Sequence, residues 1–469
     1  MKNIIIISYF ILLLLGTLFI LFLINDSILS SLIIFYLVVY FGYNISNRTC
    51  LRQGHKNFRF IHIFWLIKLF LTFFLLYWSW IPGLDPNSPT FGYDPQRYYF
   101  DAYDLLQNGW NPLVSSNYQG IIFYYGLIFY AFGHNPLIPA LINSFLTLSI
   151  ILLLINFLLS HVNNKTRKDW YIIFLLIIPE FIWYDILTSR ESILSFLIIA
   201  SCLITALLFF KEISLIKAVF FLFITLGLIL AIRTSLIFPS ILNLFLLSIF
   251  IVERHAIFDS KKIILLIILS FLISLAPLLQ SNMGGYDFDI LKAFNSTQSF
   301  ESNVASDDGF SWSNNSIGTL IMPTNTFEAI LFTPIRMILY VLSPLPNIRI
   351  SFKDLYLGNW IEWQKLFTIL TSIIMVYCVP YLMSGFSYVI RNRKTEKAGL
   401  VIYITFWVYF IAICGGNLII HERYRVMISI LFFTCAWYGY TRAGNSLKYI
   451  LIWFCLLLHG GLFYIFYKY

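Results

Sequence analysis

The stretch IIIISYFILLLLGTLFILFL occupies residues 4–23 and contains no charged side chain. A helix of about 18 or more such residues is long enough to cross the hydrocarbon core of a bilayer. Comparable runs recur as far as residues 449–466. Leu23-Ile24-Asn25-Asp26 offers no small-residue cleavage site after the first run, so we interpret this run as a retained span and not as a secretory signal peptide.

The composition of the whole chain agrees with this first stretch. Of the 469 residues, 59% are hydrophobic and 11% are charged, whereas a soluble domain has about 25% charged residues because its surface faces water. No long polar stretch could form a separate soluble domain. The composition therefore excludes a soluble globule. It predicts an all-α, polytopic bundle of transmembrane helices, forming a single membrane-embedded domain over residues 1–469.

The net charge of +9 has a simple explanation in a membrane protein. Basic residues collect in cytoplasmic loops, so we expect membrane lipid as a partner and no nucleic acid. The six cysteines are scattered and contain no CxxC pair. Most of them lie in apolar runs, and we interpret them as small core residues, neither disulfides nor metal ligands.

Lysine and arginine fix the predicted topology. Five basic loops are assigned to the cytoplasm, and they are residues 47–60, 165–168, 253–262, 391–397 and 441–448. With a cytoplasmic N-terminus, about 13 spans of bilayer length follow, and the C-terminus lies outside a multi-pass inner or plasma membrane. The predicted spans are residues 4–24, 28–46, 61–81, 137–160, 170–187, 192–210, 216–232, 236–252, 263–281, 364–390, 398–415, 426–441 and 449–467.

Two large external loops remain, at residues 82–136 and 282–363. Each contains an apolar segment, 120–132 in the first and 327–342 in the second. The segment 120–132 is short for a span, and carrying it across the bilayer would move the basic loop at 165–168 outside. We therefore expect a helix at the outer interface, where its aromatic residues suit an aromatic belt. These residues are Tyr124, Tyr125, Phe129, Tyr130 and Phe132.

The first loop contains a predicted helix. Asp94 followed by Pro95 indicates a helix start, with Asp94 as N-cap, and Gly109 is a plausible end. Helical spacing places Asp94, Arg97, Asp101 and Asp104 near one face. This face could simply be solvated, with Asp94 acting only as a cap, or it could be functional, and both interpretations stay open at this point.

Further ionisable residues fall at the predicted outer ends of later spans. Glu180, Asp185, Arg190 and Glu191 surround one outer turn, and ionisable residues at membrane depth usually face a cavity or a partner. Arg190 and Glu191 could instead form a surface pair of little consequence. Lys68 lies inside a predicted span, near enough to the cytoplasmic side for its side chain to reach that surface.

Arginines on the external side oppose the usual charge bias. They are Arg190, Arg233, Arg336, Arg349, Arg423 and Arg425. Guanidinium groups bind phosphate through paired, planar hydrogen bonds, so a polyprenyl phosphate or pyrophosphate headgroup is a suitable ligand. Contacts with ordinary anionic lipids are the alternative. His421 is a possible general base, but without a second histidine at ligand spacing it does not indicate a metal.

Four local patterns resemble the GT-C superfamily of membrane glycosyltransferases. They are the acidic tract 94–109, the tract 117–143 with Asn117-Tyr118-Gln119-Gly120 and Gly133-His134-Asn135, the turn Arg233-Thr234-Ser235, and Arg423-Tyr424-Arg425. The resemblance covers residues 60–260 and 415–440. It implies a GT-C-like fold that transfers sugar from a polyprenyl-phosphate-linked donor to a glycan or lipid acceptor on the external face.

The resemblance also implies residue roles. Asp94, or Asp101 as second choice, would be the catalytic base, and Arg233, Arg423 and Arg425 would stabilise charge on the leaving phosphate. The residues assigned to substrate binding are Arg97, Glu180, Arg190, Glu191, Arg233, Arg336, His421, Arg423 and Arg425. No organic cofactor is expected, and a divalent metal is possible without support from ligand spacing. An O-antigen or capsular repeat-unit polymerase and a polysaccharide or lipid flippase are the alternatives.

Overall fold

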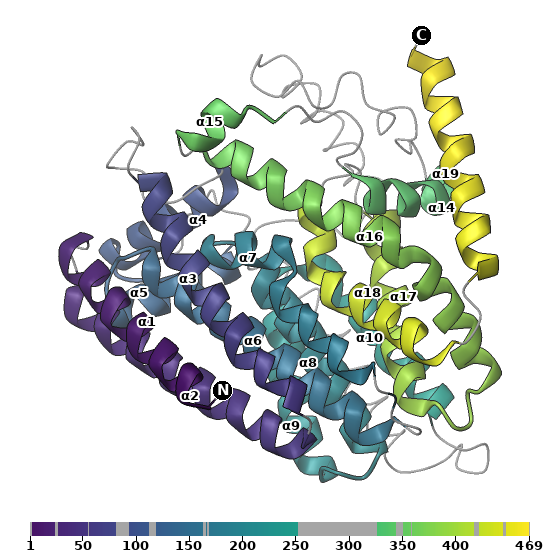
Figure 1. Ribbon diagram of the computed structural model, residues 1–469, viewed down its shortest axis with the longest axis horizontal. Coiled ribbons are helices and arrows are strands. Elements are labelled where there is room, and N and C mark those ends of the chain that lie inside the picture. Colours follow the sequence, from purple (N-terminus) through teal and green to yellow (C-terminus); the bar gives the residue numbers. More distant parts are fainter. Residues whose placement is uncertain are drawn as a thin grey trace. The chain divides into compact units, whose positions relative to one another are not determined.

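The structure is a computed structural model that describes residues 2–23, 27–54, 56–80, 93–111, 119–162, 166, 168–251, 326–343, 350–357, 359–416, 422–443 and 447–468. Within these ranges the chain forms helices and no strand (Figure 1). The predicted all-helical class is therefore confirmed for the described part of the chain. The predicted span 263–281 and the polar stretch 282–325 lie outside the described residues.

The chain divides into two compact units. Unit 1 comprises Met1–Ile237 and Ile348–Thr371, and unit 2 comprises Phe238–Asn347 and Ser372–Tyr469. The long helix α16 (Trp360–Arg391) contributes residues to both units.

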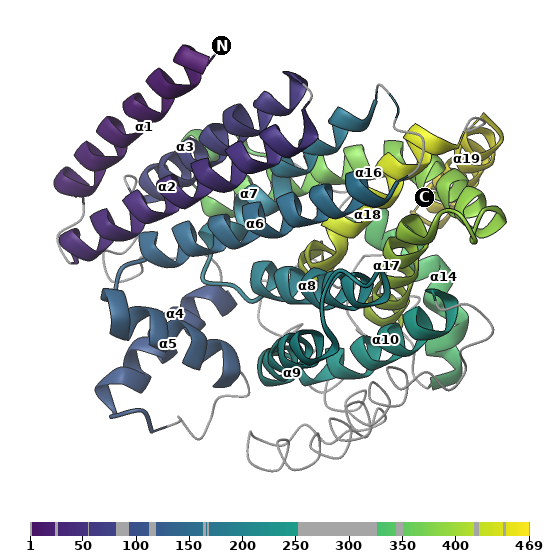
Figure 2. The same ribbon diagram turned by 90° about the horizontal axis from the view of Figure 1, so that it is seen from below.

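Unit 1 contains most of the N-terminal helices. Helices α1 (Lys2–Leu23), α2 (Ile28–Gln53), α3 (Phe60–Trp80) and α6 (Leu137–His161) pack together. Helix α8 (Glu191–Phe209) packs on α6 and on α9 (Leu215–Ile232). Helix α4 (Tyr93–Gln107) lies beside α5 (Gln119–Phe132) (Figure 2). The pair α4 and α5 positions the candidate site.

The predicted span 170–187 is not one continuous α-helix. It consists of a 3₁₀ helix, η2 (Asp169–Ile177), followed by the eight-residue helix α7 (Pro179–Ile186). Pro179 explains the break, because a proline lacks a backbone N–H and disfavours helical geometry in the preceding residue. Ile178 accordingly adopts ψ 121°. The break places α7, with all but its first residue buried, as a separate element inside unit 1.

The second helix extends further than predicted. Helix α2 continues from the expected end at residue 46 to Gln53, and a short 3₁₀ helix, η1 (Lys56–Arg59), follows. Gly54 ends α2 with φ 66° and a hydrogen bond from its N–H to the carbonyl of Cys50, a geometry that glycine adopts without strain. Polar side chains stabilise this extension, since Gln53 Nε2 donates to Asn156 Oδ1 on α6 over 3.2 Å.

Unit 2 is built from helices near the C-terminus, α17 (Lys397–Gly416), α18 (Glu422–Arg442) and α19 (Leu447–Lys468), together with α10 (Ile237–Ile251) and α14 (Thr326–Leu342). Helices α16 and α18 approach closely, because a Cβ on Gly439 would overlap the Tyr381 carbonyl oxygen. The Tyr403 hydroxyl on α17 donates to the Cys435 carbonyl over 2.7 Å. Small residues and a buried hydroxyl thus hold three helices together.

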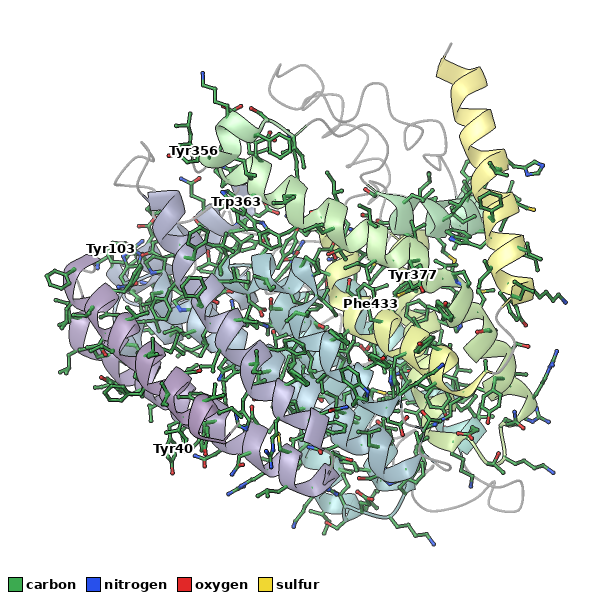
Figure 3. All side chains as sticks on the ribbon, in the orientation of Figure 1. Tyr40, Tyr103, Tyr356, Trp363, Tyr377 and Phe433 are labelled. Carbon is green, nitrogen blue, oxygen red and sulfur yellow. The ribbon has the colours of Figure 1, made fainter. Side chains whose placement is uncertain are left out.

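Eight of the described helices are long and apolar enough to cross a membrane. This result fits a multi-pass membrane protein, and the predicted count of about 13 spans stays a prediction. Large apolar side chains also cover the outer surface of the helices, as on α1, where Phe10 is 68% exposed. Tyr40 and Tyr356 likewise project outward (Figure 3). Such continuous apolar surface is unusual for a soluble protein.

Candidate functional site

The acidic helix predicted within residues 82–136 is present in the structure. Helix α4 begins at Tyr93, two residues before Pro95, the predicted first helical residue. Asp94 therefore lies within the first turn of α4 and is not its N-cap, which corrects that prediction. A carboxylate in the first turn interacts favourably with the helix dipole. Arg97 Nε lies 3.4 Å from Asp101 Oδ2, which confirms that these two residues share a face. Gly109, with φ +63°, follows the end of the helix. Asp94 is half-buried and Arg97 is exposed.

The carboxyl of Asp101 is influenced by two opposing effects. Burial raises its pKa above the ordinary value for aspartate, and the neighbouring Arg97 guanidinium lowers it through charge and a hydrogen bond. Burial is the larger effect. A carboxylate with a raised pKa accepts a proton more readily than a fully solvated one, which is a property that a general base requires.

A turn between α7 and α8 lies against α4. This turn comprises residues 187–190, and three hydrogen bonds hold it. The Thr188 hydroxyl donates to the Pro95 carbonyl over 2.6 Å, and the Tyr125 hydroxyl donates to the Ser189 carbonyl over 2.6 Å. Asn143 Nδ2 donates to the Leu187 carbonyl over 3.1 Å. Helices α4, α5 and α6 therefore fix the turn, and the first turn of α4, with Asp94, lies beside it.

Arg190 and Glu191 end this turn and begin α8. Both residues are buried, at 6% and 2% exposure, and Arg190 Nε lies 3.8 Å from Glu191 Oε1. The alternative of a surface pair is therefore wrong, because neither side chain faces the surface of the unit. Glu191 is in the first turn of its helix, where the positive end of the helix dipole stabilises it further.

Glu180 lies at the other end of α7. It is 0% exposed, and its backbone N–H donates to Thr371 Oγ1 on α16 over 3.1 Å. Trp183 stacks on Phe367 of the same helix, with ring centroids 6.1 Å apart. These contacts anchor α7 to the part of α16 that belongs to unit 1, so α7 presents one carboxylate near each of its ends within a packed interior.

The prediction that the Lys68 side chain reaches the cytoplasmic surface is wrong. This side chain is 1% exposed, and Nζ lies 2.5 Å from Asp185 Oδ2. Thr147 on α6 donates to Asp185 Oδ1 over 2.8 Å. Sequence reasoning missed Lys68, Asn143 and Thr147 as members of this polar region. The one available signal was their position as polar residues inside apolar runs.

Arg233 follows α9 and precedes the short 3₁₀ helix η3 (Thr234–Leu236), as the predicted outer turn requires. Its Nε donates to Ser235 Oγ over 3.3 Å. The end of α9 is held against the start of α5, because a Cβ on Gly120 would overlap the Ala231 carbonyl oxygen. Helix α5 thus contacts both α4 and the helix that carries Arg233.

The aromatic residues of α5 divide between the interior and the surface. Tyr125 and Phe129 are 0% and 3% exposed and belong to the core of unit 1, whereas Tyr130 is 73% exposed. The expectation that all five aromatic residues form an outer belt is therefore wrong for Tyr125 and Phe129. Packing against α4 and the turn 187–190 explains the difference.

The remaining predicted arginines belong to unit 2. Arg425 is 1% exposed, and its guanidinium donates to the carbonyls of Tyr340, Val341 and Ser343 and to Ser372 Oγ. These contacts cap the C-terminus of α14. That Arg425 binds phosphate stays a prediction. The contacts of its guanidinium with the end of α14 do not support it.

Arg336 and Arg423 have different surroundings. Arg336 is 1% exposed on α14. Arg423 is half-buried, and its guanidinium carbon lies 5.1 Å from the ring centroid of Tyr424, within the range of a cation–π contact. His421 and Arg349 lie outside the described residues. The convergence of these arginines with Asp94 and Arg233 stays a prediction, since the two groups belong to different units.

In the ranges that the structure describes, no group of three or more histidine, cysteine, aspartate or glutamate side chains could hold a metal ion.

Comparison with known proteins adds no assignment. No protein-family model matches the chain, and no curated protein or solved structure matches it either. The functional assignment therefore depends on the residues and their geometry.

Proposed function

We propose that the chain is a membrane glycosyltransferase of GT-C-like type. It transfers a sugar from a polyprenyl-phosphate-linked donor to a glycan or lipid acceptor at the external face of the inner or plasma membrane. Its N-terminus lies in the cytoplasm and its C-terminus lies outside. Glycan and envelope polysaccharide assembly is the process to which this reaction belongs.

One observation carries the proposal. The Thr188 hydroxyl donates to the Pro95 carbonyl over 2.6 Å, so the first turn of α4 lies beside the turn that ends in Arg190 and Glu191. The acidic helix and the turn that carries Arg190, nearly a hundred residues further along the chain, are thereby adjacent within unit 1. A carboxylate that can accept a proton and a cation that can bind phosphate are the two groups that such a transfer requires.

The roles follow from the chemistry of the transfer. Asp94, with Asp101 as second choice, would accept the proton of the acceptor hydroxyl as its oxygen attacks the anomeric carbon of the donor. The bond between that carbon and the phosphate oxygen breaks, and the phosphate leaves with the electron pair. Arg190 and Arg233, both in unit 1, are the cations that we assign to this phosphate.

The proposal predicts that Asp94→Asn abolishes transfer while the protein still folds. The asparagine keeps the shape of the side chain but cannot accept the proton, and loss of a general base typically lowers the rate by about 10²–10⁴-fold. Full-length protein in liposomes is supplied with polyprenyl-phosphate-linked sugars, and release of polyprenyl phosphate is measured. Asp104→Asn, an exposed change on the same helix, is the matched control. Equal rates in the wild type and Asp94→Asn would remove Asp94 as the base.

A repeat-unit polymerase would use the same groups with a pyrophosphate-linked oligosaccharide, and the length of the product distinguishes it from a single-sugar transferase.

A flippase is favoured by a different observation. The span 170–187 is interrupted at Ile178 and Pro179, and interrupted helices are common at the binding sites of transporters. A flippase would move the intact lipid-linked sugar across the liposome bilayer without releasing polyprenyl phosphate.

A further inference from the structure

Helix α7 (Pro179–Ile186) is a short element with a break at each end. Ile178 before it and Leu187 after it have extended backbones, with ψ 121° and 149°, so α7 is continuous with neither η2 nor α8. In a longer helix, the backbone hydrogen bonds of the neighbouring turns fix the orientation of each residue. Because α7 lacks such neighbours, contacts of its side chains must fix how it is rotated and where its end lies.

The C-terminal end of α7 is held by two other helices. The carboxylate of Asp185 pairs with Lys68 Nζ of α3 over 2.5 Å and accepts a hydrogen bond from Thr147 of α6 over 2.8 Å. Asn143, one turn before Thr147 on α6, donates to the Leu187 carbonyl over 3.1 Å. Helices α3 and α6 therefore fix the end of α7, and the hydrogen bonds with α4 and α5 fix the turn that follows.

The Lys68–Asp185 pair is the charged part of this arrangement. The two side chains are 1% and 0% exposed, and within the described residues Asp185 is the only group that pairs with the Lys68 ammonium. Replacing a buried ion pair with apolar side chains is often neutral or stabilising, so stability is a weak reason for this pair. A buried charge without its partner is strongly unfavourable. The pair therefore restricts α3 and α7 to arrangements in which the two charges meet.

We propose that Lys68 and Asp185 are positioning residues for the turn 187–190. The pair fixes the rotation of α7 about its axis, and the turn, which begins directly after Ile186, is then held in one position with Arg190 at its end. The pair acts through the turn and not on the reacting atoms. The consequence for binding of the donor phosphate by Arg190 rests on the proposed function, whereas the effect on the turn does not.

The test compares the wild type with the double variant Lys68→Met/Asp185→Leu, both at full length in lipid nanodiscs. The variant keeps apolar contact between α3 and α7 and removes the requirement that two charges meet. Residues 187–191 are all buried, so hydrogen–deuterium exchange of their amides measures local opening of the turn. This exchange should become about tenfold faster or more, whereas the midpoint of thermal unfolding should stay that of the wild type or rise.

The matched control is the double variant Gln53→Leu/Asn156→Leu. These two side chains also form a polar contact between helices of unit 1, with Nε2 and Oδ1 3.2 Å apart. They join α2 to α6, and Asn156 lies nine residues beyond Thr147, about 14 Å along the helix axis. Removal of this contact should leave the exchange of residues 187–191 at the rate of the wild type.

The single variant Thr147→Val keeps the test decisive if the double variant does not fold. It retains both charges and removes one of the two groups that hold Asp185, so exchange of the turn should become about two- to tenfold faster. The proposal is overturned if the turn exchanges as in the wild type in every α7 variant that folds. An equal rise in exchange throughout unit 1 would also overturn it, because that result indicates a general loss of stability.

Sugar transfer by the same variants tests the consequence for Arg190. Because the turn is less well held, the KM for the lipid-linked donor should rise about tenfold or more, and the KM for the acceptor should not change. An unchanged donor KM beside faster exchange of the turn would overturn the link to Arg190. A wild type that releases no polyprenyl phosphate would contradict the proposed function alone, because exchange of the turn still decides the positioning role.

Discussion

The guanidinium of Arg425 is enclosed by the end of another helix, and this position gives a prediction at the scale of a single residue. Arg425→Met would remove the guanidinium donor from the carbonyls of Tyr340, Val341 and Ser343, of which Ser343 keeps the Ser372 hydroxyl as a donor. Each buried polar group that loses its partner costs about 1–3 kcal/mol. The free energy of unfolding should therefore fall by about 3 kcal/mol or more, measured by thermal unfolding in nanodiscs.

Ser372→Ala is the matched control for Arg425→Met. It removes one acceptor of the guanidinium and one donor to the Ser343 carbonyl, and it leaves the Arg425 donors of the α14 carbonyls in place. Its effect should be about 1–2 kcal/mol. The two interpretations of Arg425 are thereby separated. If Arg425→Met unfolds like the wild type but no longer binds polyprenyl phosphate, Arg425 is a ligand-binding residue and the capping role is wrong.

At the same scale, Lys68 shows what the sequence could and could not predict. A lysine inside an apolar run is visible in the sequence, but its partner is Asp185, more than a hundred residues away. Only the packing of α3 against α7 and α6 brings them together. Without that contact, extension of the side chain to the nearer surface is the reasonable interpretation. The α4 residues were predictable because their spacing of three and four is local.

At the scale of helices, two glycines make a paired prediction. Gly120 on α5 has no room for a Cβ beside the Ala231 carbonyl, whereas a Cβ on Gly227 of α9 would meet no other atom within 4 Å. Gly120→Ala should force α5 away from α9 and destabilise the protein by about 1–3 kcal/mol. Gly227→Ala should be neutral or stabilise by up to about 1 kcal/mol, because alanine is the better helix former.

Thermal unfolding of the two alanine variants in the same lipid provides the measurement. Because α5 also holds the turn 187–190 through Tyr125, Gly120→Ala should lower sugar transfer as well, whereas Gly227→Ala should not. A Gly120→Ala variant with unchanged stability would mean that α5 and α9 do not approach as closely as the structure indicates.

Helix boundaries also show where sequence reasoning succeeded and where it failed. Hydropathy predicted α3, α6, α8 and α9 to within one or two residues, because an apolar run of bilayer length has few other solutions. It joined η2 and α7 into one span, since hydropathy does not register the missing N–H of Pro179. Hydropathy also did not predict the extension of α2, because the last two turns of this helix are polar and yet remain helical.

For the whole molecule, the class of multi-pass membrane protein was predictable from composition, because 11% charged residues cannot cover a soluble surface of this size. The site was predictable only in part. The packing of Asp94's helix against the turn 187–190 depends on Thr188, Tyr125 and Asn143, and no local pattern in the sequence indicates the contacts that these residues make. Contacts between distant segments are a property of the fold and cannot be read from spacing.

Sidedness is the property of the whole molecule on which the proposed transfer depends, and it gives the last prediction. Cysteines are placed singly in a variant without the six native ones, at Gln107, the last residue of α4, and at Lys394 between α16 and α17, both exposed positions. Because basic loops remain in the cytoplasm, Cys at position 107 should react with a membrane-impermeant thiol reagent in intact cells. Cys at position 394 should react only after permeabilisation. The reverse pattern would place α4 on the cytoplasmic side, where a lipid-linked donor presented externally could not meet Asp94.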